Sequence, residues 1–253
     1  MKTTLIQAPL VWENLEANLF YFENKIKEVE NTDLVVLPEM FTTGFSMNVS
    51  NATNGEETIF WMKKMATQFN FAICGSIKIK ENNLFYNRFY FVTPLEEVFF
   101  YNKRHLFTLA NEDKVYTKGT EKVIVNYNNW KICLQICYDL RFPVFSRNTE
   151  DYDLLIYVAN WPKIRINAWD SLLKARAIEN MCYVIAVNRI GKDNNQLEYN
   201  GHSQVVDFLG NYCIEPFETE EQKSTTLNQT EMLESRNKLN FLNDRDEFKV
   251  MII

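Results

Sequence analysis

The chain has 253 residues, of which 24% are charged and 46% apolar, and its formal net charge is −6. An aromatic content of 14% excludes a mainly disordered protein. The acidic balance argues against a nucleic-acid partner, and the absence of an 18-residue apolar run argues against a membrane span. Because only two histidines are present, a histidine base or a His-rich metal site would have to use His105 or His202.

The first residues, MKTTLIQAPLVWENLE, lack the apolar core of a signal peptide. The five cysteines are odd in number and thinly spread, which fits free thiols in a reducing compartment. No repeat and no Gly/Ser/Pro-rich linker divides the sequence. We therefore expect a cytoplasmic protein that forms one domain over residues 1–253.

Helical patterns and short apolar runs follow one another along the chain. Apolar residues recur with helical spacing in residues 14–29, 58–69 and 168–181. In the second of these helices, the spacing places Phe60 and Trp61 on the buried face. The apolar runs rich in β-branched and aromatic residues are TTLIQAP, DLVVLPE, FAICGSIKI, NRFYFVTP, EEVFFYNK, KVIVNY, KICLQICYD, DLLIYVAN, CYVIAVNR and SQVVDF.

This order of elements predicts an α/β protein with large, partly antiparallel sheets covered by helices. The runs DLVVLP and DLLIYVAN are apolar nearly throughout, so both faces of these strands should be buried. A turn at Thr93-Pro94-Leu95 should join the strands on either side into a hairpin.

Abrupt polar groups follow some of the apolar strands, which is where α/β folds place functional residues. Glu39 follows Pro38 after the run LVVL, and Lys103, Arg104 and His105 follow VFFY. Taken alone, Glu39 could equally cap a helix or turn, and the three basic residues could form a solvated turn.

The third such strand end is WKICLQICYDLRFP, where Cys137 stands at a strand-to-helix turn. Amide groups at the start of a helix lower the pKa of a nearby thiol and can bind an oxyanion. The alternative is a small buried apolar side chain, which is our interpretation of Cys74, Cys182 and Cys213. The CxxxC spacing of Cys133 and Cys137 does not indicate a metal site, because two further ligands at a useful spacing are missing.

Together these residue types supply a complete set for acyl transfer. A carboxylate such as Glu39 can take the proton of a cysteine nucleophile, and Lys103 can stabilise the anion that forms on the attacked carbonyl. A protease-like dyad of His105 and Cys137 is a second interpretation, with His202 as a weaker candidate base. Composition and periodicity do not decide whether these residues meet in space.

The motifs LPEMFTTGF, YNKRHLF and ICYDLRFP, in this order and at these separations, resemble the nitrilase superfamily of carbon–nitrogen hydrolases. The resemblance continues through NEDKVYTKG, VANWP, AWDSLLKARAIEN, VNRIG and YNGHSQVVDFLG, and so covers most of the chain. The combination of LPEMF, KRHLF, CYDLRFPV and ANWP, together with the ending FLNDRDEF, is most similar to the ω-amidases of that superfamily.

The resemblance implies a single-domain αββα sandwich with a Glu-Lys-Cys triad and no metal or organic cofactor. By match of motif, Glu39 is the general base, Lys103 the oxyanion-stabilising and proton-donating cation, and Cys137 the nucleophile. Glu112 matches the second glutamate of the family, which orients the lysine or the substrate. The backbone N–H of Tyr138 joins the lysine at the oxyanion.

The substrate implied for an ω-amidase is a short amide with a carboxylate at its far end, such as 2-oxoglutaramate or 2-oxosuccinamate. Such a pocket needs a cation and aromatic walls, for which we select Arg165 with Phe45, Trp161 and Tyr116. Arg141 is expected in a structural ion pair instead, because CYDLRFP occurs in amidases of differing substrate preference.

Two other functions stay open from the sequence. One is hydrolysis of a different amide or of an N-carbamoyl compound, and the other is an inactive member that serves as an interaction module. The resemblance also implies a homodimer or a larger homo-oligomer, built through the helices near residues 141–149 and 168–181. The expected partner is a small-molecule amide, with neither a nucleic acid nor a membrane.

Overall fold

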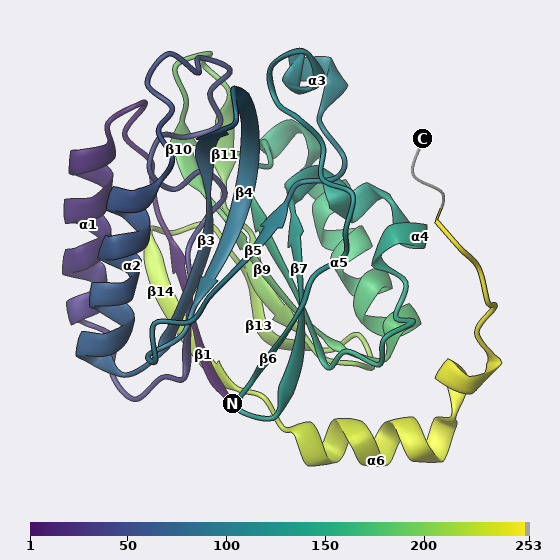
Figure 1. Ribbon diagram of the computed structural model, residues 1–253. Helices are drawn as coiled ribbons and strands as arrows, with labels where there is room; N and C mark the ends of the chain where they lie inside the picture. The colour runs from purple at the N-terminus through teal and green to yellow at the C-terminus, as the bar shows by residue number, and fades with distance from the viewer. Residues whose placement is uncertain (251–253) are drawn as a thin grey trace.

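Two six-stranded β-sheets pack face to face in the computed structural model, which describes residues 1–250 (Figure 1). In the first sheet β1, β2 and β3 are parallel to one another, and the remaining pairings are antiparallel. Its strands, in spatial order, are β14 (Glu221–Thr226), β1 (Lys2–Gln7), β2 (Leu34–Val36), β3 (Ala72–Glu81), β4 (Leu84–Val92) and β5 (Val98–Asn102).

The second sheet repeats this plan. Strands β7, β8 and β9 are parallel, and antiparallel strands flank them on both sides. In spatial order the strands are β13 (Tyr212–Phe217), β12 (Ser203–Val206), β9 (Tyr183–Asn188), β8 (Leu154–Ala159), β7 (Trp130–Ile136) and β6 (Ile124–Tyr127). A separate short hairpin consists of β10 (Ile190–Lys192) and β11 (Glu198–Asn200).

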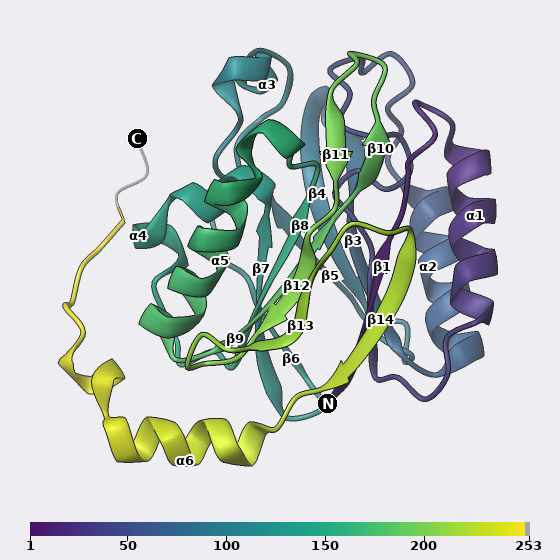
Figure 2. The same cartoon turned by 180° about the vertical axis from the view of Figure 1, so that it is seen from behind.

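Helices cover the outer face of each sheet, as Figures 1 and 2 show from opposite sides. Helices α1 (Leu15–Lys27) and α2 (Glu56–Phe69) lie on the first sheet, and α4 (Pro143–Ser146) and α5 (Ile166–Asn180) lie on the second. This layer order confirms the αββα sandwich. The remaining α-helices are α3 (Glu112–Val115) and α6 (Gln229–Leu239). No helix within residues 1–250 is long and apolar enough to cross a membrane.

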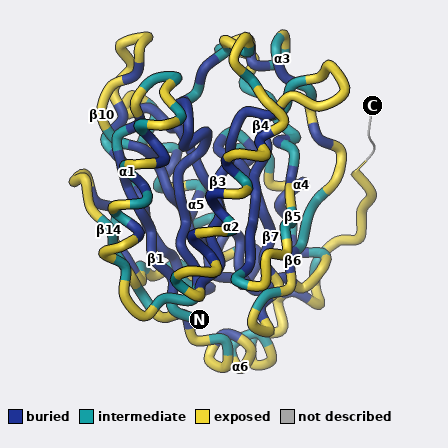
Figure 3. The backbone as a smooth tube through the Cα atoms, turned by 60° about the vertical axis from the view of Figure 1, so that its left-hand side comes forward, coloured by how far each residue is buried: buried dark blue, intermediate teal, exposed yellow. Residues whose placement is uncertain are grey.

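Strand β2 shows why the sandwich has two kinds of apolar interface. Leu34 and Val36 pack in the core between the sheets, whereas Val35 and Leu37 pack with the residues under α1 and α2. Successive strand residues point to opposite faces, so a strand covered on both sides is apolar at every position. Both faces of DLVVLP are buried, as predicted, and Figure 3 shows the buried strands enclosed by exposed turns.

The predicted helices and hairpin are confirmed, with two corrections to burial. Helix α1 begins after Asn14, whose side chain accepts a hydrogen bond from the Ala17 N–H at 3.0 Å. On α2, Trp61 is buried but Phe60 is 72% exposed, because the buried face is narrower than the apolar pattern. Cys213 is exposed instead of in the core, because it lies on an outward position of the edge strand β13.

The ends of strands from both sheets meet at one edge of the sandwich. Strand β2 ends shortly before Glu39, β7 before Cys137 and β8 before Asn160. Strand β5 ends before Lys103 and runs parallel to β3, since two antiparallel pairings separate these strands. Polar residues that follow strands running the same way gather at this edge.

Candidate active site

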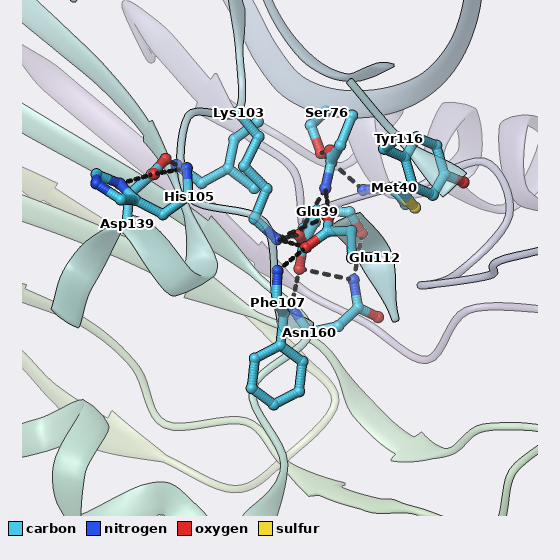
Figure 4. Close-up of polar contacts among 12 residues, drawn as sticks. Glu39, Met40, Ser76, Lys103, His105, Phe107, Glu112, Tyr116, Asp139 and Asn160 are labelled. Atoms are coloured by element: carbon cyan, nitrogen blue, oxygen red, sulfur yellow. Dashed lines mark hydrogen bonds and ion pairs between the residues drawn. The ribbon is translucent and has the colours of Figure 1, made fainter. Parts of the chain in front are cut away.

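A buried cluster of opposite charges lies where the strand ends meet (Figure 4). The Lys103 Nζ lies 2.9 Å from Oε1 of Glu39 and 3.1 and 3.0 Å from the two carboxylate oxygens of Glu112. Lys103 is 1% exposed, and both glutamates are 0% exposed. Cys137 lines the same cavity as Glu39 and Lys103. The structure therefore brings together the four side chains that the motifs indicate.

Cys137 occupies a strained position at the start of a 3₁₀-helix, Cys137–Arg141. Its φ of 43° lies in the left-handed region, which costs a non-glycine residue about 1–3 kcal/mol. The turn is held by Asp139, whose carboxylate accepts a hydrogen bond from the Ile136 N–H at 3.0 Å. The expected strand-to-helix turn is present, and it brings the thiol to the cavity beside Glu39 and Lys103.

Asp139 also ties this turn to the segment that carries Lys103. Its carboxylate accepts hydrogen bonds from the Tyr101 hydroxyl at 2.7 Å and from the His105 N–H at 3.0 Å. Nδ1 of the His105 ring lies 2.7 Å from the same carboxylate, and His105 does not line the cavity. Both ring nitrogens of His202 bind other carboxylates. The cysteine–histidine dyad is therefore wrong, and His105 serves to join two segments.

Two asparagines that the sequence patterns did not single out hold the Glu39 carboxylate. The Asn160 N–H donates to Oε2 of Glu39 at 2.7 Å, and the Asn160 side chain donates to the Glu39 carbonyl at 2.6 Å. The Asn87 side chain donates to Oε1 of Glu39 at 2.8 Å and to Oε1 of Glu112 at 3.3 Å. Asn160 ends the run DLLIYVAN and is a fourth polar strand end. The only signal for Asn87 is an amide, followed by Arg88, within the largely apolar stretch LFYNRFYFV.

Burial and charge oppose each other in this cluster. Burial disfavours the ammonium form of Lys103, but Glu112 and Glu39 outweigh it and raise the pKa of Lys103. Burial raises the pKa of Glu112, and Lys103 offsets this only in part. Lys103 therefore remains protonated beside the two glutamates and the thiol.

The Cys137 thiol departs from the sequence-based expectation. Burial and, after it, the Glu39 carboxylate raise the pKa of Cys137 well above its ordinary value, and Lys103 lowers it only in part. The expectation of a lowered pKa is therefore wrong, because desolvation outweighs the amides of a single short turn. Since the resting nucleophile is a neutral thiol, it needs a base close by.

A cavity of about 750 Å³ adjoins the cluster. Its lining includes four residues that the sequence analysis selected for substrate contact: Phe45, Tyr138, Trp161 and Arg165. Tyr116, selected as an aromatic wall, does not line the cavity. It is buried, and its hydroxyl donates a hydrogen bond to the Ser46 carbonyl at 2.6 Å, so it supports the loop behind the wall.

Two arginines line the cavity without a carboxylate partner among residues 1–250. The Arg141 guanidinium lies 4.8 Å from the centre of the Trp161 ring, and that of Arg165 lies 5.1 Å from the centre of the Phe107 ring. The expected structural ion pair of Arg141 is therefore wrong. Both guanidinium groups have their hydrogen-bond donors available to a ligand.

Acidic side chains that line the cavity are already paired. The Glu13 carboxylate accepts a hydrogen bond from the Asn48 side chain at 2.9 Å and another from the Ser46 hydroxyl. The Asp193 carboxylate accepts one from the Tyr199 hydroxyl at 2.9 Å. These two carboxylates therefore have hydrogen-bond donors of their own, whereas the guanidinium groups of Arg141 and Arg165 have donors free for a ligand.

Comparison with known families identifies the chain. The family model described as "Carbon-nitrogen hydrolase" matches residues 2–236. The chain belongs to the carbon–nitrogen hydrolase family. The matched region contains both sheets and the four residues of the buried cluster, and the resemblance stated from the motifs is confirmed.

Curated relatives of this hydrolase cover most of its length. It is 42% identical over 256 residues to "Omega-amidase YafV" of Escherichia coli (strain K12), covering 99% of this chain and 98% of the relative. The protein of the same name from Yersinia enterocolitica is 46% identical over 211 residues, covering 83% and 82%. The "2-oxoglutaramate amidase" of Bacillus subtilis is 35% identical over 210 residues, covering 80% of each chain.

Solved structures agree on the fold. The protein XC1258 from Xanthomonas campestris, a CN-hydrolase superfamily member with an arsenic adduct in its active site, is 39% identical. It superposes on this hydrolase with a TM-score of 0.97 and covers 99% of both chains. Nit3 of Saccharomyces cerevisiae, a member of the nitrilase superfamily, is 24% identical with a TM-score of 0.84 over 94% of each chain. At 24% identity, the likeness to Nit3 shows a shared fold and nothing more.

Proposed function

We propose that this hydrolase cleaves the terminal amide of short ω-amides of dicarboxylates, such as 2-oxoglutaramate and 2-oxosuccinamate, to give the acid and ammonia. The observation that carries the proposal is the pairing of two features in one cavity. A thiol, an ammonium and a carboxylate suited to acyl transfer lie beside Arg141 and Arg165, which lack carboxylate partners among the described residues. The relatives named ω-amidase and 2-oxoglutaramate amidase support the same substrate class.

The reaction begins at Cys137. Because burial keeps the thiol neutral, its proton must leave as the sulfur attacks the amide carbonyl. Glu39 is the base in this proposal, since its carboxylate lines the cavity with the thiol. A carbon–sulfur bond forms, the carbonyl π electrons move to oxygen, and the proton passes to Glu39.

The resulting oxyanion is stabilised by Lys103 and by the backbone N–H of Tyr138. Glu39 and Glu112 keep the lysine protonated, so its charge is present throughout the reaction. Loss of one such donor raises the barrier by about 3–4 kcal/mol in comparable sites. Glu112 contacts Lys103 through both carboxylate oxygens and therefore orients the cation.

The intermediate collapses with transfer of the proton from Glu39 to the amide nitrogen. Ammonia leaves as the carbon–nitrogen bond breaks, and a thioester remains on Cys137. Glu39, again a carboxylate, takes a proton from water as the water attacks the thioester. Collapse of the second intermediate releases the acid, and the proton returns to the sulfur.

The far carboxylate of the substrate is held by Arg141 and Arg165. Guanidinium groups bind carboxylates through paired hydrogen bonds, and these are strong where water is excluded. Phe45 and Trp161 supply the aromatic walls along the carbon chain. The acidic residues of the wall already accept hydrogen bonds from their neighbours and do not compete for the arginines.

A panel of amides tests this function. Ammonia release would be measured with 2-oxoglutaramate, 2-oxosuccinamate, an uncharged short amide and an N-carbamoyl amino acid. We expect the two dicarboxylate amides to show the highest kcat/KM. Preference for the N-carbamoyl compound would identify a different hydrolase of the family, and no ammonia release from 2-oxoglutaramate would contradict the proposal.

We also propose a homodimer or larger homo-oligomer that works in the cytoplasm. Val144 on α4 and Ile178 on α5 are 58% and 50% exposed, which supports contact through these helices. Light scattering after size-exclusion chromatography measures the oligomer, and a monomer at micromolar concentration would contradict it. Fractionation of the source cells tests the location.

A further inference from the structure

Asn87 on β4 contacts the buried cluster at three points. Its side-chain amide donates to Oε1 of Glu39 at 2.8 Å and to Oε1 of Glu112 at 3.3 Å. Its backbone carbonyl accepts the Lys103 N–H at 2.9 Å. The Asn87 side chain is 0% exposed and does not line the cavity, so it does not contact the substrate.

A chain of hydrogen bonds fixes which way the Asn87 amide points. The Met40 N–H donates to the Ser76 hydroxyl oxygen at 2.9 Å (Figure 4). This hydroxyl donates to Oδ1 of Asn87 at 2.9 Å. The Glu39 and Glu112 carboxylate oxygens accept, so the Asn87 NH₂ group faces them and its Oδ1 accepts the proton of the Ser76 hydroxyl. With its oxygen engaged, Asn87 can turn only its NH₂ group toward the two carboxylates.

The hydrogen bonds accepted by the four carboxylate oxygens show the effect of the Asn87 amide. Oε1 of Glu39 accepts from Lys103 and from Asn87, and Oε1 of Glu112 accepts from the same two groups. Oε2 of Glu112 accepts from Lys103 and from the Phe107 N–H at 2.6 Å. Each of these three oxygens therefore contacts Lys103 and one further donor.

Oε2 of Glu39 differs from the other three oxygens. It contacts neither Lys103 nor Asn87, and both of its donors come from Asn160, the backbone N–H at 2.7 Å and the side chain at 3.4 Å. The Asn160 backbone N–H also lowers the pKa of the Cys137 thiol, and Cys137 lines the cavity together with Glu39. Among the four carboxylate oxygens, Oε2 of Glu39 is therefore the one that neither Lys103 nor Asn87 occupies.

We propose that Asn87 is a positioning residue that makes Oε2 of Glu39 the proton acceptor of the site, by occupying Oε1 of both glutamates. This inference rests on the proposed function for the role of Glu39. The charged and titratable groups that face Glu39 are Lys103, Glu112, Cys137 and Tyr116, and none of them is removed by changing Asn87.

The test compares Asn87→Leu with the wild-type enzyme. Loss of the amide removes one donor from each carboxylate and disfavours their charged forms. A base must be deprotonated to act, so the acid limb of the kcat/KM profile should move up by about one pH unit. We expect kcat at neutral pH to fall by about 10- to 100-fold, while KM changes less than threefold because the cavity wall is unchanged.

Ser76→Ala is the milder variant. It removes the hydroxyl that directs Asn87 and should move the acid limb in the same direction by a smaller amount. If Asn87→Leu does not yield folded protein, Ser76→Ala decides by itself, and an unchanged acid limb would overturn the proposal.

Asn148→Leu is the matched control, because Asn148 is a buried asparagine whose amide donates to the carbonyls of Tyr152 and Asn180, outside the cavity. This variant should lower the melting temperature and leave kcat and the acid limb unchanged. A loss of stability in Asn87→Leu with the wild-type acid limb would show a structural role only and overturn the inference.

Alkylation of Cys137 by iodoacetamide gives a readout that does not depend on the substrate. Its rate, followed by mass spectrometry across pH, should show the same upward shift in Asn87→Leu. If the wild-type enzyme is inactive on 2-oxoglutaramate but the alkylation profile still shifts in Asn87→Leu, the proposed substrate class is wrong and the role of Asn87 is supported. If the wild-type enzyme is active on 2-oxoglutaramate and the profile does not shift in Asn87→Leu, the substrate class is supported and the role of Asn87 is contradicted.

Discussion

The buried cluster of Glu39, Lys103, Glu112 and Cys137, which we call the floor of the site, is built differently from the part of the cavity that carries Arg141 and Arg165, which we call the wall. On the floor, Glu39, Lys103 and Glu112 are at most 1% exposed, and several hydrogen bonds fix each of them. On the wall, Arg141 and Arg165 are half-buried and contact aromatic rings through their guanidinium groups. The floor is fixed by strand ends, whereas the wall stands on short turns and loops.

This difference separates bond breaking from substrate choice. A group that is buried among several partners cannot be altered without disturbing those partners. A guanidinium with free donors can be replaced at little cost to its neighbours. We therefore expect floor variants to lose chemistry or stability, and wall variants to lose preference for one substrate class.

The largest effect is expected for Cys137→Ala. Turnover of 2-oxoglutaramate should fall by about 10⁴- to 10⁶-fold, because no other group forms the thioester. The melting temperature should stay close to the wild-type value, since only one sulfur atom is lost. Cys213→Ala is the matched control and should keep full activity. Substantial turnover by Cys137→Ala would place the nucleophile elsewhere.

The second largest loss of activity is expected for Lys103→Met. Loss of the oxyanion cation should lower kcat by about 10²- to 10³-fold. The variant also leaves two buried carboxylates without their cation, which should cost about 3–5 kcal/mol of unfolding free energy in urea titrations. Lys114→Met changes the same charge on an exposed side chain and should alter neither quantity. A stable Lys103→Met enzyme would break the distinction between floor and wall.

Arg141→Met and Arg165→Met test the wall. Each should lower kcat/KM for 2-oxoglutaramate by about 10- to 100-fold, because a hydrogen bond to a charged group contributes about 1.5–3 kcal/mol. The loss should be mainly in KM, and hydrolysis of an uncharged short amide should change little. Equal losses on both amides would show that the arginines serve the chemistry and not the carboxylate.

The smallest effect concerns alkylation by iodoacetamide at neutral pH. Cys137 should be modified first although burial raises the pKa of its thiol, because Glu39 can take the proton during attack. Glu39→Gln should slow this labelling by about tenfold. Cys213 is exposed, and the pKa of its thiol is raised to about 11, so it should react slowly. Preferential labelling of Cys213 would contradict base assistance.

The sequence predicts the floor better than the wall because of chain geometry. Glu39, Lys103 and Cys137 each follow an apolar strand, and the ends of similarly directed strands meet at one edge. Asn87 escapes prediction because it lies inside β4, where its role depends on β3 and on Glu112. Such contacts across strands leave no periodic signal along the chain.

Three further predictions from the sequence are wrong for physical reasons. The turn at Cys137 predicts a lowered pKa from its amides, but the pattern does not show how deeply the thiol is buried. The shared motif around Arg141 predicts an ion pair, but a residue common to many relatives can still face the cavity. Phe60 and Cys213 follow the apolar pattern and yet face outward, since a pattern does not give the width of a buried face.

The hydrogen bond from the Asn160 N–H to Glu39 joins residues 121 positions apart, and Lys103 and Cys137 lie between them in the chain. During synthesis, Glu39 therefore cannot be held in place until residue 160 has left the ribosome and the two sheets have packed together. Partly made chains and partly unfolded molecules should carry only an unreactive thiol. Ammonia production should then serve as a reporter of complete folding, lost in denaturant no later than the sandwich itself.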